Sequence, residues 1–154
     1  MKRSSVAHLN CSVAQSLEVV GEWWTLLVLR NIMLGQRRFE AIQANLGIAR
    51  NILSDRLGTL VEHDIVSRVK YQDAPERFEY RLTRRGRDLF PVIVTLMTWG
   101  DEHEAPEGPP LLFTHECGST AAPVVVCSAC GGPIRLDNVR PKAGPGFRRQ
   151  ATND

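Results

Sequence analysis

Residues 39–63 read FEAIQANLGIARNILSDRLGTLVEH and contain two segments whose apolar residues recur at helical spacing. The pattern predicts a short helix over 39–46, a turn at Gly47 and a longer helix over 49–63. In the longer helix, Leu53, Leu57 and Leu60 fall on one face. Glycine is frequent in the turn of helix-turn-helix motifs, but short helix pairs occur in many proteins. The assignment therefore depends on the segments on either side.

The segment that follows changes to a period of two. Residues 65–71 and 78–82 alternate between apolar and polar side chains, with Pro75 in the turn between them. Two alternating runs around a turn predict a β-hairpin. Residues 37–39 fit a short edge strand or a turn. A helix pair followed by a basic hairpin predicts a winged helix-turn-helix.

Further helices are predicted on both sides of this unit. Residues 11–20 have helical spacing, and residues 23–34 are apolar nearly all round, which predicts a central buried helix. Thr83 is a suitable N-cap for a last helix that reaches about His103. Pro91 should either kink that helix or mark a late start.

The stretch from Asp101 to Pro110 is acidic and rich in proline, which favours a domain boundary. The predicted fold class is α+β and mostly helical: a winged helix-turn-helix domain with a small C-terminal zinc-ribbon-like module. The expected parts are a DNA-binding and dimerisation domain over 1–103, a linker over 104–110, the module over 111–140 and a flexible tail over 141–154.

The composition, with 43% hydrophobic and 23% charged residues, excludes a mostly disordered chain, a collagen and a coiled-coil rod. No apolar stretch is long enough to cross a bilayer, and the opening residues lack the apolar region of a signal peptide. We therefore expect a soluble, cytoplasmic protein. The four histidines are scattered, and no nucleophile–base set or P-loop occurs, so we expect no enzyme.

The net charge of +2 is unevenly distributed: +4 over residues 1–100, −5 over 101–134 and +3 over 135–154. Arginine outnumbers lysine 16 to 3. Because the guanidinium fork matches phosphates and guanine edges, this bias favours a polyanionic partner. A genome of high GC content, which encodes arginine in place of lysine, would produce the same bias.

The N-terminal half of the second helix of a helix-turn-helix enters the major groove. There, Asn51 can pair with adenine and Arg50 with guanine. Arg56 lies nearer the core edge, where it would bind a phosphate or pair with a neighbouring acid. Arg77, near the hairpin tip, would reach a minor groove or a phosphate, unless it belongs to a solvated strand face. The predicted DNA-binding residues are Arg38, Arg50, Asn51, Ser54, Arg56, Lys70 and Arg77.

Several motifs in register resemble HxlR-type bacterial transcriptional regulators, a MarR-like family of winged-helix proteins. The resemblance covers about residues 8–100, with Ser12 where the family often has proline and Glu22-Trp23 where it often has Gly-Lys. The motifs are Cys11–Leu17, Val20–Arg30, Gly35–Ile42, Leu53–Leu57, Pro75–Tyr80 and Leu82–Leu89.

The resemblance implies a homodimeric regulator that binds double-stranded DNA, and we expect a repressor acting on a two-fold operator. It leaves the signal open, and a small-molecule or redox effector is expected. Some relatives sense oxidants through a cysteine at the position of Cys11, although a lone cysteine on a helix is often a small buried side chain. The rival hypothesis is a zinc-ribbon interaction module whose winged helix binds protein or RNA.

Residues 90–99 carry more apolar side chains than one small core can bury, which favours a dimer interface, unless the C-terminal module covers them. We expect the first and last helices to form this interface. Its predicted residues are Val13, Leu17, Ile93, Leu96, Met97 and Trp99.

The C-terminal module contains His115-x-Cys117 and Cys127-x-x-Cys130, the latter followed by two glycines. Three thiols and one imidazole suit tetrahedral zinc, and four protein ligands make the role structural. We therefore expect one structural zinc per chain. A metal-free ribbon and a redox pair remain alternatives.

Overall fold

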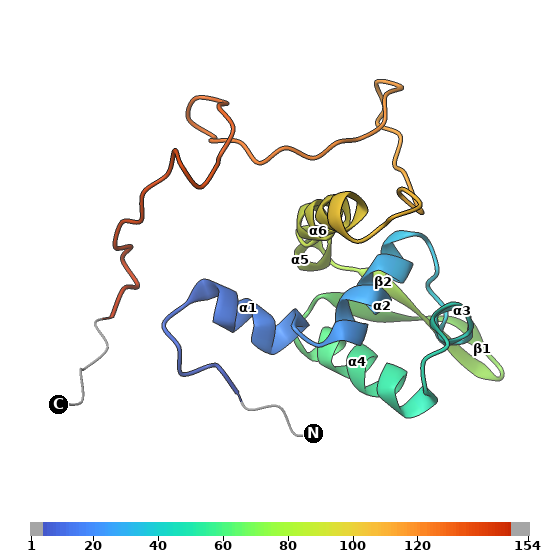
Figure 1. The fold of residues 1–154 in the computed structure, drawn as a ribbon. Coiled ribbons are helices and arrows are strands. Elements are labelled where there is room, and N and C mark those ends of the chain that lie inside the picture. Colours follow the sequence, from blue (N-terminus) through green and yellow to red (C-terminus); the bar gives the residue numbers. More distant parts are fainter. Residues whose placement is uncertain (1–4, 149–154) are drawn as a thin grey trace. The chain divides into compact units, whose positions relative to one another are not determined.

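The computed structural model describes residues 5–148. The chain divides into two compact units, residues 1–93 and 94–154, with the last helix, α6 (Phe90–His103), beginning in the first unit and ending in the second. Figure 1 shows the helices of the first unit around a single β-hairpin. Its elements are α1 (Ser12–Val20), α2 (Trp23–Met33), α3 (Phe39–Leu46), α4 (Arg50–Glu62), β1 (Val66–Asp73), β2 (Glu76–Leu82) and α5 (Arg84–Arg87).

The core of the first unit lies where α4 packs against α2 and α3. Leu53, Leu57 and Leu60 of α4 are buried, as their spacing predicts. Gly47 ends α3 in the left-handed conformation, with φ of 61°, so the turn between the two helices uses the conformation that glycine favours. The predicted helix-turn-helix is confirmed. The buried residues that α4 meets are Val28, Leu29 and Ile32 of α2, Ile42 of α3, and Ile48.

Helix α2 differs from its prediction on one side. Val28, Leu29 and Ile32 are buried, but Trp23 is 84% exposed and Leu27 36%. The helix therefore has one buried face, and the prediction of burial all round is wrong. An apolar run that covers a whole helix does not distinguish a buried face from one left for a partner.

The hairpin is antiparallel, with Val66 opposite Leu82 and Arg68 opposite Tyr80. The register shifts between Lys70 and Gln72, so the outer part of β1 carries one extra residue. The backbone N–H of Tyr80 donates to the carbonyl of Arg37 at 2.7 Å, and Arg38 forms a bridge with Glu79. The segment before α3 thus pairs with the edge of the two-stranded sheet at one bridge residue, Arg38, and does not form a strand, because Phe39 already begins α3.

Helix α5 is fixed by Thr83, whose hydroxyl oxygen accepts the N–H of Gly86 at 3.0 Å and donates to the carbonyl of Asp64 at 2.7 Å. The chain leaves the helix at Asp88–Leu89 before α6 begins, so the predicted continuous helix from Thr83 is two helices. Pro91 is the second residue of α6, within the first turn, where a missing N–H costs no helical hydrogen bond. The late start is the alternative that holds.

The second unit contains the rest of α6 and two isolated β-bridges, Thr114–Thr120 and Val126–Pro133. Its secondary structure beyond α6 consists of turns and bends over the described part of the chain. No helix among residues 5–148 has the length and apolar character needed to span a membrane.

Candidate nucleic-acid interface

The N-terminal half of α4 presents a polar face to solvent. Arg50, Asn51 and Ser54 are exposed, while Leu53 and Leu57 on the opposite side are buried. A side chain on a helix with a rigid, buried back is held at a defined position, which suits readout of base edges. The predicted face of α4 therefore consists of side chains with an amide, a hydroxyl and a guanidinium available.

Three arginines around this face stack on aromatic rings. The guanidinium carbon Cζ lies 4.8 Å from the ring centroid of Phe39 for Arg50, 4.6 Å from that of Tyr71 for Arg38, and 3.6 Å from that of Phe78 for Arg68. Stacking fixes the plane of the guanidinium while leaving its N–H edge available to an acceptor. Preorganised donors lose less side-chain entropy when they bind a phosphate or a guanine.

A hollow of about 230 Å³ separates the start of α3 and α4 from the hairpin, which is the wing of the motif. Arg50, Arg68 and Arg77 line it together with Tyr71 and Tyr80. Burial raises the pKa of Tyr80 above its usual value, an effect that Arg68 partly opposes. The Tyr80 phenol therefore stays protonated at neutral pH and remains a hydrogen-bond donor. The remaining lining residues are Phe39, Glu40, Glu76 and Phe78.

Two predicted DNA-binding residues are engaged by acids. Lys70 Nζ lies 2.7 Å from a carboxylate oxygen of Glu76 and 3.5 Å from one of Asp73. Arg56 pairs with Glu22, the N-cap of α2, at 4.0 Å, and its Nε is buried. The sequence predicts either phosphate binding or pairing with an acid for Arg56, and the structure shows the pairing with an acid. Among residues 5–148, no ion pair involves Arg38, Arg50 or Arg77.

The structure adds Arg68 to the candidates. Its guanidinium lies against Phe78 and it lines the hollow, although the sequence placed no more than a basic strand there. The signal is in the register: Arg68, Phe78 and Tyr80 fall on one face of the hairpin once β1 and β2 are paired. That pairing depends on an extra residue in β1, which periodicity alone does not reveal.

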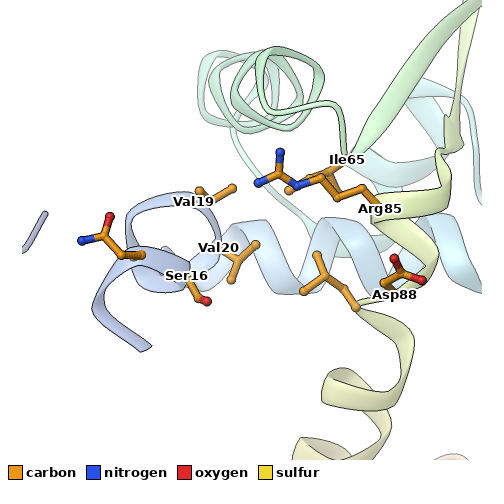
Figure 2. Close-up of a pocket in the computed structure, with 8 residues that line it drawn as sticks. Ser16, Val19, Val20, Ile65, Arg85 and Asp88 are labelled. Atoms are coloured by element: carbon orange, nitrogen blue, oxygen red, sulfur yellow. The ribbon is translucent and has the colours of Figure 1, made fainter. Parts of the chain in front are cut away.

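A second concavity lies between α1 and α5, with a volume of about 340 Å³. Figure 2 shows Ser16, Val19 and Val20 of α1 on one side and Arg85 and Asp88 on the other. The volume lies within the range of small-molecule sites, and the lining combines apolar side chains with two opposite charges. Ile65, Gln15 and Leu89 complete the lining.

The predicted dimer residues divide into two groups. Val13 is 65% exposed, Trp99 55% and Leu96 52%, so these side chains remain available to a partner. Ile93 is buried in the core and does not belong to an exposed face, which corrects its place in the predicted interface. Leu96 and Trp99 follow Ile93 by three and six residues and are exposed. The apolar residues of α6 lie on all sides of the helix, so the core does not bury all of them. Leu17 is 40% exposed, and Met97 is half-buried.

Cys11 is an exposed free thiol at the N-cap of α1, and is not the small buried side chain that one alternative expected. Three of the four predicted metal ligands are cysteines, and these are also free thiols. The four predicted ligands are His115, Cys117, Cys127 and Cys130. Within residues 5–148, no three histidine, cysteine or acidic side chains lie close enough together to hold one metal ion. The predicted zinc-ribbon module is therefore not assembled in this structure.

Known proteins match this chain well beyond the winged helix. A helix-turn-helix transcriptional regulator from Mycobacterium tuberculosis is 54% identical over 139 residues, which are 89% of this chain and 88% of that protein. The crystal structure of the transcription factor PA1607 matches with a TM-score of 0.81 and 33% identity, over 92% of this chain and all of that one. A transcription factor structure from Pseudomonas aeruginosa, PA1374, matches with a TM-score of 0.62 and 33% identity, over 90% of this chain and 95% of that one.

The model of the HxlR-like helix-turn-helix family matches residues 19–107, which contain α2 to α6 and the hairpin. The matches to the Mycobacterium protein and to PA1607 cover 89% and 92% of this chain, which is more than residues 1–107 contain. These relatives therefore share part of the C-terminal unit. The family model, the relatives and the geometry of α4 and the wing all indicate a helix-turn-helix protein. This chain belongs to the HxlR-like helix-turn-helix family and is a transcriptional regulator.

Proposed function

We propose that this protein binds double-stranded DNA in a sequence-specific way, as a homodimer on a two-fold operator, and that it acts as a repressor. The observation that carries the proposal is the exposed row Arg50, Asn51 and Ser54 at the start of α4. Its polar side chains lie on the half of the helix that enters a major groove in helix-turn-helix proteins.

The wing supports this docking. With α4 in the major groove, a basic hairpin beside it meets the neighbouring backbone or minor groove. Arg68 and Arg77 line the hollow between hairpin and helix, and Arg77 is exposed. In this docking Arg50 and Asn51 of α4 would read bases, and Arg38, Arg68 and Arg77 would bind phosphates.

A titration of fluorescent duplexes from the promoter of the protein's own gene tests the proposal. We expect tight binding to one duplex, a footprint with two-fold symmetry, and a log affinity that falls linearly with log salt. Asn51→Ala should cost about 1–3 kcal/mol and relax preference at one position per half-site. Glu62→Ala, at the exposed far end of α4, is the matched control. An asymmetric footprint, or unchanged sequence preference in Asn51→Ala, contradicts the docking.

The same titration separates this proposal from the rival, in which the winged helix binds protein or RNA. A weak affinity that is equal for all duplexes, beside tight binding to a structured RNA, would favour the rival. The repressor role has its own measurement: adding protein to an in vitro transcription reaction should lower the yield from the bound promoter.

We further propose that the groove between α1 and α5 binds a small-molecule effector with an apolar body and one charged group. The pair Arg85 and Asp88 would select the charge, and Val19 and Val20 would contact the body. A thermal-shift screen of amphipathic acids and amines tests this against Ser16→Trp, which fills the groove, and Leu136→Trp, an exposed control that does not line it. Compounds that shift Ser16→Trp as much as the wild type contradict the assignment.

A further inference from the structure

Two short hairpins in the C-terminal unit are built by the same hydrogen bonds. The first hairpin covers residues 113–121 and the second covers residues 125–134. In the first, the N–H of Ala121 donates to Phe113, that of His115 to Ser119, and that of Gly118 to His115, at 2.8–2.9 Å. In the second, the N–H of Ile134 donates to Val125, that of Cys127 to Gly132, and that of Gly131 to Cys127, also at 2.8–2.9 Å.

This pattern makes His115 the equivalent of Cys127, and Cys117 the equivalent of Cys130. Each second position is followed by a glycine in the left-handed region, Gly118 with φ of 87° and Gly131 with φ of 70°. The left-handed glycine turns the chain back directly after the second side chain, so both donors of a pair lie at one tip. The two halves differ in length by one residue, because the first pair is separated by one residue and the second by two.

Backbone N–H groups also point at the first donor of each pair. In the first hairpin, Nδ1 of His115 accepts the N–H of Cys117 at 3.3 Å. In the second, the backbone N–H groups of Ala129 and Cys130 donate to the sulfur of Cys127. The backbone N–H of Ser119 donates in the same way to the sulfur of Cys117. Such N–H donors compensate the negative charge of a thiolate.

We propose that the two hairpins of one chain close on a single Zn²⁺, with the sulfur atoms of Cys117, Cys127 and Cys130 and the imidazole of His115 as its four ligands. A neutral imidazole binds zinc through the nitrogen that carries no proton, which is Nδ1 here because it accepts the N–H of Cys117, so zinc would replace that hydrogen bond. Three thiolates and one imidazole are a ligand set that zinc takes in tetrahedral structural sites.

The connection between the hairpins allows this closure. Residues 122–124 separate them, so the open ends of the two hairpins lie within about 14 Å of each other along the chain, and rotation about this link would bring the tips together. Val124 of the link and Val125 and Ile134 of the second hairpin are exposed, so the hairpins lack a core that would hold them together without a cross-link. Zinc would supply the cross-link, and its binding energy would then be folding energy for residues 111–134.

The test is elemental analysis of the full chain, purified without a histidine tag and in the presence of a thiol reductant. We expect about one zinc per chain, with the three C-terminal thiols protected from a thiol reagent until a chelator is added. Replacement by Co²⁺ should give the visible absorption of a tetrahedral thiolate site. Less than about 0.2 zinc per chain with all four thiols freely reactive would overturn the proposal, as would a Cys127–Cys130 disulfide that persists in the protein purified with the reductant.

Variants identify the ligands and the arrangement. Cys127→Ser and Cys117→Ser should each lose most of the zinc, and His115→Ala should weaken it, whereas Cys11→Ser is the matched control and should retain it. Retention of full zinc by both Cys117→Ser and His115→Ala would contradict a site that uses both hairpins. Conversion of a dimer to monomers by chelator would contradict a site within one chain. Operator affinity is measured separately, so loss of DNA binding and loss of zinc remain distinguishable.

Discussion

Arg50, the first residue of α4, stacks on the ring of Phe39, the first residue of α3, with 4.8 Å between the guanidinium carbon and the ring centroid. The contact joins the starts of the two helices of the helix-turn-helix. It holds the guanidinium over the start of α3 while its N–H edge remains available. The aromatic residue that opens α3 therefore has a role in positioning a residue of the other helix.

Replacing Arg50 by lysine tests this relationship. Lysine retains the charge but loses both the planar stack and the bidentate fork. We expect Arg50→Lys to weaken operator binding by about 1–3 kcal/mol with a smaller change on unrelated duplexes. Phe39→Leu should produce part of the same loss. Equal losses on operator and unrelated DNA would show that Arg50 contacts phosphate alone.

Arg56 should behave differently because it pairs with Glu22. We expect Arg56→Ala to lower the free energy of unfolding by less than about 1 kcal/mol, since the pair is partly exposed. Base preference at the operator should be unchanged. Denaturant unfolding and a panel of point-substituted operators measure the two effects. A shift in base preference as large as that of Asn51→Ala would show that Arg56 contacts bases, which contradicts this prediction.

Much of the fold was predictable because the spacing of apolar residues and the position of glycine determine local structure. The buried row Leu53, Leu57 and Leu60 and the left-handed Gly47 define the helix-turn-helix without tertiary information. The break at Asp88–Leu89 was predicted as one of two alternatives, since proline near a helix start suits both a kink and a late start. Burial of α2 was overestimated because apolar composition does not reveal which face of a helix the core covers.

The candidate site was predictable residue by residue but not as a set. Exposure of Asn51 and Ser54 follows from the helical period, whereas the engagement of Lys70 by Glu76 depends on the turn that brings the ends of β1 and β2 together. The contribution of Arg68 depends on the shifted register of the hairpin. Long-range pairing decides which basic residues remain available, and sequence spacing does not encode it directly.

Gly86 provides a test of packing with a control in the same chain. A Cβ at this position would lie 2.1 Å from the carbonyl oxygen of Ile65, a backbone atom that cannot move aside alone. We expect Gly86→Ala to destabilise the protein by about 2–3 kcal/mol. Gly58, in the exposed part of α4, has no atom within 4 Å of its Cβ position, so Gly58→Ala should stabilise by about 0.5–1 kcal/mol. Similar midpoints of thermal unfolding for the two variants would contradict the clash.

Cys11 is predicted to respond to oxidants, because it is an exposed thiol at the N-cap of α1. We expect diamide treatment to change the operator affinity of the wild type severalfold, reversibly with a thiol reductant. Cys11→Ser should bind the operator normally and lose this response. Since the C-terminal thiols also react with diamide once zinc is absent, Cys130→Ser is the comparison. If Cys130→Ser loses the response and Cys11→Ser retains it, the sensing thiol lies in the C-terminal unit.

The proposed dimer interface is tested at α6, where Leu96 and Trp99 are about half exposed. A charge there would be buried without a partner on association, so Leu96→Asp and Trp99→Asp should yield monomers. Because one protomer offers one recognition helix, operator affinity should fall as the dimer is lost. Leu136→Asp, at a position 96% exposed in the C-terminal unit, is the control and should remain dimeric. Light scattering at micromolar concentration measures the mass, and a monomeric wild type would contradict the homodimer.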